Sequence, residues 1–160
     1  VHKYGLERIA IIDFDVHHGN GTEKICANDP TIKMFSFFQH PFFPYSGTED
    51  VASNMHNVPL KAYSGREEVE AAVNSVWLPI MEEYRPELVI ICAGFDAHRD
   101  DDMGQMSLLE RDFIWLTKQL MAVADRHCQG RVISFLEGGY NLSALARSAT
   151  EHVRALAGFC

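Results

Sequence analysis

The stretch Asp13-Phe14-Asp15-Val16-His17-His18-Gly19-Asn20-Gly21-Thr22 is the most informative part of this chain. It follows the apolar residues 9–12, which predict a short strand buried on both faces, as in a parallel sheet. Carboxyl ends of such strands form the ligand-binding crevice of an open α/β sheet. Asp15 and His17 are therefore placed to share a metal ion, with oxygen and nitrogen donors that suit zinc. The alternative is an acidic strand end with solvated histidines.

Composition indicates one globular domain. The chain has 160 residues, of which 47% are apolar and 22% charged, and its net charge is −8. Dispersed acidic residues argue against a nucleic-acid surface and are compatible with a cationic substrate. No apolar stretch is long enough to span a membrane. We expect reduced thiols in a cytoplasmic protein, because no paired spacing relates the cysteines, which are Cys26, Cys92, Cys128 and Cys160.

Strands are expected to alternate with helices along the whole chain. The expected strands are 8–13, 31–37, 57–60, 88–93 and 131–136. The expected helices are the tail of one in residues 1–7, then 23–27 capped by Thr22, 64–84, 107–128 and 142–156. Capping boxes are predicted at Ser64 to Glu67 and at Ser107 to Glu110, and Pro79 should kink or split its helix. The pattern predicts an α/β fold, a mostly parallel sheet with helices on both faces.

Three strand ends are followed at once by chemically active side chains. Asp15 and His17 follow the first strand, Asp96 follows residues 88–93, and Tyr140 follows the last strand behind Gly138 and Gly139. Two carboxylates and an imidazole form an open metal site with room for water and substrate. The two glycines let the backbone approach a ligand closely, and the tyrosine is placed as a hydrogen-bond donor.

Two loops have open interpretations. Residues 38–47 combine two prolines and a glycine with several aromatic rings, including Phe42 and Phe43. These rings either plug the edge of the core or form the apolar wall of a ligand channel. The charged residues 98–102 either bind a cationic substrate near the rim or form a solvated loop with weak salt bridges.

The motifs resemble those of the histone deacetylase family, including its bacterial deacetylase-like and acetylpolyamine amidohydrolase members. They are the run from Ile12 to Thr22, then Ala93-Gly94-Phe95-Asp96, then Leu136-Glu137-Gly138-Gly139-Tyr140. The resemblance covers essentially all 160 residues, as the carboxyl-terminal half of a single deacetylase domain. It implies the arginase/deacetylase fold and a zinc-dependent amidohydrolase that removes acetyl groups from acetylated amines.

Carried over residue by residue, the resemblance implies roles for several side chains. Asp15, His17 and Asp96 resemble the zinc ligands, and Tyr140 resembles the tyrosine that polarises the acetyl carbonyl together with zinc. The residues that resemble the walls of the substrate channel are Phe42, Phe43, Gly138 and Gly139. The residues that resemble a structural potassium site are Asp13 and Ser36, with backbone groups of Asp15, His17 and Phe37.

One departure concerns the family's acid–base pair of adjacent histidines, which lies before the Asp-x-Asp-x-His motif. The only histidine before the first expected strand is His2. The resemblance therefore implies a domain that is incomplete at its amino terminus. The expected partners are an acetylated amine and either a second copy of the chain or the missing half. The alternative function is an inert metal-binding or oligomerisation module. An arginase-like two-manganese site is disfavoured because it needs more carboxylates and leaves Tyr140 without a role.

Overall fold

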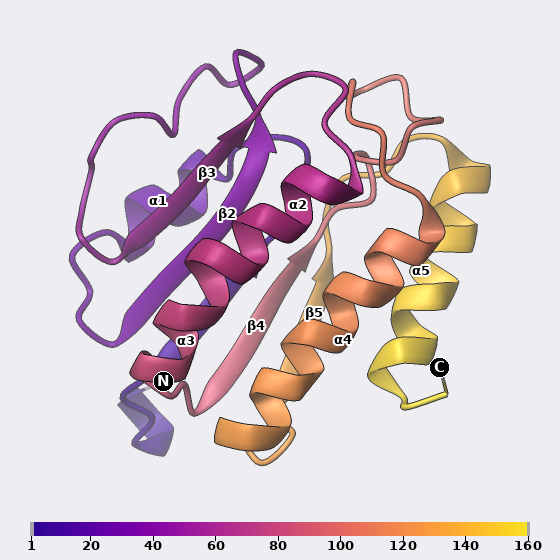
Figure 1. Ribbon diagram of the computed structural model, residues 1–160. Coiled ribbons are helices and arrows are strands. Elements are labelled where there is room, and N and C mark those ends of the chain that lie inside the picture. Colours follow the sequence, from indigo (N-terminus) through magenta and orange to yellow (C-terminus); the bar gives the residue numbers. More distant parts are fainter. Residues whose placement is uncertain (1, 160) are drawn as a thin grey trace.

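The computed structural model describes residues 2–159, and its centre is a single five-stranded sheet (Figure 1). All neighbouring strands are parallel, in the order β3-β2-β1-β4-β5. The strands are β1 Ile9–Asp13, β2 Ile32–Gln39, β3 Met55–Leu60, β4 Leu88–Ala93 and β5 Val132–Leu136. The expected parallel α/β fold is confirmed. Because β1 is central, it is buried along its whole length, which explains its continuous apolar sequence.

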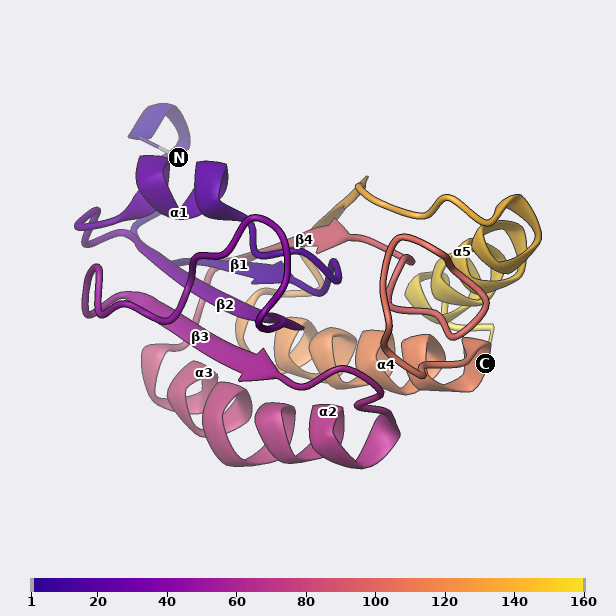
Figure 2. The ribbon, with the colours of Figure 1, turned by 90° about the horizontal axis from the view of Figure 1, so that it is seen from above.

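Helices cover the two faces of the sheet unequally. Figure 2 shows α2, α3 and α4 along one face and α1 over the other. The α-helices are α1 Asn20–Cys26, α2 Arg66–Ala72, α3 Leu78–Tyr84, α4 Glu110–His127 and α5 Leu142–Leu156. A short 3-10 turn, His2–Tyr4, precedes β1, where the tail of a helix was expected. No helix in residues 2–159 is long and apolar enough to cross a membrane.

The main core lies between the sheet and helices α2 to α5. Trp77 is fully buried there, and its ring stacks on Phe37 with 5.6 Å between centroids. Phe14, directly after β1, is equally buried and contacts Phe95 and Phe113. Burial of such rings contributes about 3 kcal/mol each. This packing fixes the end of β1 relative to the end of β4. It therefore also fixes the positions of the polar residues that follow these two strands.

Helix starts differ from the sequence predictions. Helix α1 begins at Asn20 after Gly19, so Thr22 lies inside it and does not cap it. The capping boxes lie further along the chain than predicted, since Glu68 accepts from the Gly65 N–H at 2.8 Å and Asp112 from the Leu109 N–H at 2.8 Å. The long helix splits as Pro79 suggested. A π-helical turn, Val73–Trp77, separates α2 from α3, because proline offers no N–H to the preceding turn.

Strand β5 forms an open edge of the sheet. Ile133 and Phe135 lie beside Ile90 and Cys92 on the face that carries α1, and Phe135 is 53% exposed. Cys26, Cys92 and Cys128 are buried and free, as expected, while Cys160 lies outside the described residues. An uncovered apolar strand at a sheet edge is a surface on which further polypeptide can pack.

Candidate metal centre

Two neighbouring strands bring the three expected metal ligands together. Asp15 and His17 follow β1, and Asp96 follows β4, which pairs with β1 in parallel. His17 Nδ1 lies 3.0 Å from Asp15 Oδ1 and 3.2 Å from Asp96 Oδ2. One ligand atom from each residue lies within 4.8 Å of the other two. These distances suit a shared ion with an open side.

Backbone hydrogen bonds hold these side chains in place. Asp96 Oδ1 accepts from the Val16 N–H at 2.9 Å, which ties the end of β4 to the end of β1. Asp15 Oδ1 accepts from the His17 N–H at 2.8 Å, and Asp15 Oδ2 accepts from the Gly138 N–H at 2.8 Å. Each carboxylate is therefore oriented by the chain before any ion binds, as a metal site requires.

Two glycines make room for the carboxylates. A Cβ on Gly138 would lie 2.0 Å from Asp96 Oδ2, and one on Gly94 would lie 2.3 Å from Asp15 Oδ2. Real side chains do not approach so closely, so both positions require glycine. The absence of a side chain at Gly138 thus lets the backbone approach the metal ligands as well as the cavity.

The electrostatics of the cluster favour a bound cation. Burial raises the pKa of Asp96, because the charged carboxylate loses contact with water, and its Oδ2 has no well-aligned hydrogen bond to any described residue. A cation at this position would stabilise the charged form. The hydrogen bond to Asp15 and then the Asp96 carboxylate beside Nδ1 raise the pKa of His17 to about 10. A proton on His17 Nδ1 therefore occupies the position between the carboxylates, where a metal ion would replace it.

A cavity of about 490 Å³ opens beside these ligands. Its walls come from the ends of β1 and β5 and from the loop after β2. The lining residues are Asp13, Asp15, His17, His18, Gly19, Thr22, Phe43, Leu136, Glu137, Gly138 and Tyr140. Burial and the nearby Asp96 and Asp15 raise the pKa of Tyr140, so its phenol keeps the proton that a hydrogen-bond donor needs.

The residues expected to form the channel walls do not all line the cavity. The Phe42 ring stacks on His17 at 5.5 Å between centroids, and the Phe43 ring meets it edge-on at 6.1 Å. Gly139 does not line the cavity, because a Cβ there would face Leu145 at 3.0 Å. Its backbone has φ of +145°, which a glycine adopts at little cost. Gly139 thus makes the turn here, and its role as a channel wall stays a prediction.

The residues expected to hold potassium lie together behind the ligands. Asp13 and Ser36 pair in register across β1 and β2, and both are buried. Ser36 Oγ has no hydrogen-bond partner among residues 2–159. Burial raises the pKa of the Asp13 carboxyl to about 8. The side chain of Phe37 is in the core, so only its backbone is available to an ion.

Some residues of the site were not identified from the sequence. Glu137 lines the cavity, whereas the sequence predicted roles only for its neighbours Gly138 and Tyr140. His18 is buried and contacts Ser46 Oγ at 2.8 Å, which ties the aromatic loop to β1. In the charged loop, His98 and Asp101 are buried, so the solvated-loop interpretation is wrong for these two. The one sequence signal for Glu137 and His18 is that both lie inside the motifs quoted above.

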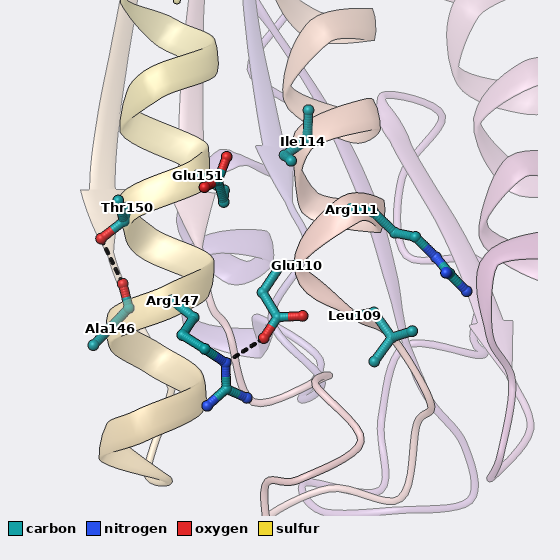
Figure 3. A pocket seen from close by; sticks show the side chains of 8 residues that line it. All are labelled: Leu109, Glu110, Arg111, Ile114, Ala146, Arg147, Thr150 and Glu151. Carbon is teal, nitrogen blue, oxygen red and sulfur yellow. Dashed lines mark hydrogen bonds and ion pairs between the residues drawn. The ribbon is translucent and has the colours of Figure 1, made fainter. Parts of the chain in front are cut away.

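A larger cavity of about 760 Å³ lies apart from the three ligands, between α4 and α5 (Figure 3). Charged side chains of both helices contribute to its lining, and Arg147 of α5 forms an ion pair with Glu110 of α4. Arg147 also contacts Asp100 Oδ2 at 3.1 Å. The groove is therefore crossed by ion pairs that join α5 to the loop after Asp96.

The chain is similar to known proteins in sequence and in fold. A sequence profile of the family described as "Histone deacetylase domain" matches residues 1–156. The chain is 34% identical to a "Probable deacetylase" of Archaeoglobus fulgidus over 98% of its own length and 46% of the relative. It is 39% identical to "Polyamine deacetylase HDAC10" of Mus musculus, covering 98% of the chain and 25% of the relative. The crystal structure of the HDA15 HD domain superimposes with a TM-score of 0.90 at 32% identity, over 99% of this chain and 47% of that one. The chain thus spans about half or less of the proteins it matches.

Proposed function

The chain belongs to the histone deacetylase family, and from that premise we propose that it is the carboxyl-terminal half of a zinc-dependent deacetylase domain. The observation that carries the proposal is the cluster of Asp15, His17 and Asp96. Its ligand atoms lie within 4.8 Å of one another, and the buried Asp96 Oδ2 lacks a well-aligned hydrogen-bond partner among the described residues. Two carboxylates and one imidazole suit zinc and leave a position for substrate.

Each residue has a distinct role in the proposed reaction. Asp15, His17 and Asp96 would hold the ion, which when bound supplies a Lewis acid that polarises a carbonyl and acidifies water. The Tyr140 hydroxyl donates a hydrogen bond to the acetyl carbonyl oxygen as negative charge develops on it. Phe42 and Phe43 flank His17 and give the acyl-bearing side chain an apolar path.

The substrate class that we propose is an acetylated amine, either acetyl-lysine or an acetylpolyamine. Glu137 lines the cavity, and the chain has a net charge of −8, which supports a substrate that carries positive charge elsewhere. A relative named as a polyamine deacetylase is consistent with this class. The apolar path and the acidic surroundings together favour a long amine over a small neutral amide.

Proton transfer in this reaction requires a general base, which the family resemblance assigns to two adjacent histidines of the amino-terminal half. We therefore propose that the chain acts together with polypeptide that completes the domain. The open edge of β5, with Ile133 and Phe135 exposed, supports such an association. A second copy of the chain is the alternative occupant of this edge.

The test compares zinc-loaded chain with the same chain mixed with the amino-terminal half of the Archaeoglobus fulgidus relative. Acetate release from an acetyl-lysine peptide and from an acetylated polyamine is measured. We expect slow release by the chain alone, since loss of a general base costs on the order of 10²–10⁴ in rate, and faster release after mixing. The Tyr140→Phe variant should lower the rate of the mixture about 100-fold.

Zinc binding without acetate release from either substrate, alone or mixed, would favour an inert metal-binding module. A mixture whose rate does not change with Tyr140→Phe would remove the carbonyl-donor role. Gel filtration of the mixture serves as the control, because it shows whether the two halves associate at all.

We also propose that a potassium ion binds at Asp13 and Ser36. The support is the unpartnered Ser36 Oγ and the buried Asp13 carboxyl beside it. A cation that binds only the folded state stabilises it in proportion to its concentration. The melting temperature should therefore be higher in potassium chloride than in choline chloride of equal ionic strength, and a Ser36→Ala variant should lose most of the difference. Equal melting temperatures in the two salts would contradict the site.

A further inference from the structure

The buried carboxylate of Asp101 is bound to the backbone of the segment that carries Tyr140. Asp101 is 4% exposed, and its Oδ2 accepts from the Tyr140 N–H at 2.7 Å and from the Asn141 N–H at 2.9 Å. Its Oδ1 accepts from the Met103 N–H at 2.9 Å. The adjacent Asp102 is exposed, so only one of the two neighbouring carboxylates is committed to this segment.

Tyr140 depends on its backbone for its position. Its side chain is 57% exposed, and its hydroxyl forms no hydrogen bond with the described residues, so packing alone does not hold it. The preceding Gly139 has no side chain to anchor the turn. On the other side of Gly139, the Gly138 carbonyl accepts from the Phe95 N–H at 2.7 Å. The hydrogen bonds to Asp101 are therefore the anchor on the Tyr140 side of the turn.

The loop that holds Asp101 is itself braced. The Asp101 N–H donates to the His98 carbonyl at 3.0 Å. Asn141 Nδ2 donates to the Asp100 carbonyl at 2.9 Å, and Arg147 of α5 contacts Asp100 Oδ2 at 3.1 Å. Arg147 also forms the ion pair with Glu110 that Figure 3 shows. Charge-assisted hydrogen bonds of this kind are stronger than neutral ones. These hydrogen bonds and ion pairs thus join the start of α5 to this loop.

We propose that Asp101 is a positioning residue, which fixes the backbone of Tyr140 and thereby keeps its side chain at the cavity beside the metal ligands. The proposal rests on the proposed function for the role of Tyr140 and on the structure for the hydrogen bonds. Asp96 and Asp101 belong to the same loop, five residues apart. One loop therefore sets the distance between a metal ligand and the carbonyl donor. A free carboxylate at this position would be solvated, whereas Asp101 is buried with three backbone donors around it.

The first experiment measures amide hydrogen exchange in residues 137–142 of the purified chain. Asp101→Ala should speed exchange of the Tyr140 and Asn141 amides about 10-fold, because each loses a hydrogen bond to a charged acceptor. Asp101→Asn should restore part of the protection, since its one carbonyl oxygen can accept both N–H groups while its NH2 group leaves the Met103 N–H without an acceptor. Asp102→Ala, the matched control, should leave exchange unchanged. Equal exchange in the original chain and Asp101→Ala would overturn the proposal.

The second experiment separates positioning from general stability by a double-mutant cycle. The probe is acetohydroxamic acid, a zinc chelator with a carbonyl oxygen, titrated into the zinc-loaded chain. Asp101→Ala should weaken binding about 10-fold on its own and have almost no effect in the Tyr140→Phe background, while zinc affinity stays unchanged. Equal weakening in both backgrounds would mean that Asp101 acts through another residue, which overturns the proposal. If the chain binds no zinc or no probe, the proposed function fails, and the exchange result alone decides the role of Asp101.

Discussion

Replacing Asp96 with alanine is expected to reduce the zinc content of the purified chain from about one ion to nearly none, a loss in affinity of roughly 100- to 1,000-fold. The estimate divides the apparent binding free energy of a four-ligand zinc site, about 10–16 kcal/mol, among its ligands. Asp96 is fully buried and its Oδ2 faces His17 Nδ1 at 3.2 Å, so no other described carboxylate takes its place without a shift of the backbone. Zinc per chain is measured by elemental analysis after dialysis against a weak chelator.

Two companion variants make this experiment specific. Asp96→Asn keeps an oxygen for the Val16 N–H but removes the charge, so it should lose zinc while it retains the fold. Asp102→Ala removes an exposed carboxylate nearby and should bind zinc as the original chain does. If Asp96→Asn retained a full complement of zinc, the ion would have to bind elsewhere, and the three strand ends would not form the metal site.

The chain is expected to lose about 3 kcal/mol of its unfolding free energy at pH 4 relative to neutral pH through His152 alone. Burial lowers the pKa of His152 to about 4, whereas an unfolded chain has a histidine pKa of about 6.5. Between these values the unfolded state binds a proton that the folded state does not. Stability therefore falls as the pH falls through this window and is fully present above pH 6.5. Urea unfolding at pH 7.5 and at pH 4 measures the difference.

The surroundings of His152 account for this effect. Its Nδ1 lies 2.7 Å from Thr117 Oγ1 and its Nε2 lies 2.9 Å from Ser134 Oγ, while the rings of Phe14 and Phe95 pack edge-on against it. None of these groups can compensate a positive charge. A His152→Gln variant has no titrating group here and should have a pH dependence smaller by about 3 kcal/mol. An unchanged pH dependence in this variant would show that His152 takes up its proton without unfolding.

The sequence by itself determined the main elements and the three metal-ligand candidates. Strand β4 and helix α5 have the bounds that their apolar patterns predicted, because those patterns span the whole of each element. Asp15, His17 and Asp96 could be found because each follows a strongly apolar strand, and parallel strands open their carboxyl ends on one edge. These are local signals combined with one rule of topology.

Only the tertiary structure decided how these groups are held. Gly138 bonds to Asp15 across 123 residues and Asp101 bonds to Tyr140 across 39, and no local periodicity encodes such contacts. The helix starts after Gly19 and Gly65 were also missed, because a start depends on which backbone groups find a partner. The sequence therefore determined which residues gather at the sheet edge, and the packed chain decided which of them touch, because burial and hydrogen bonding act between segments that are distant in sequence.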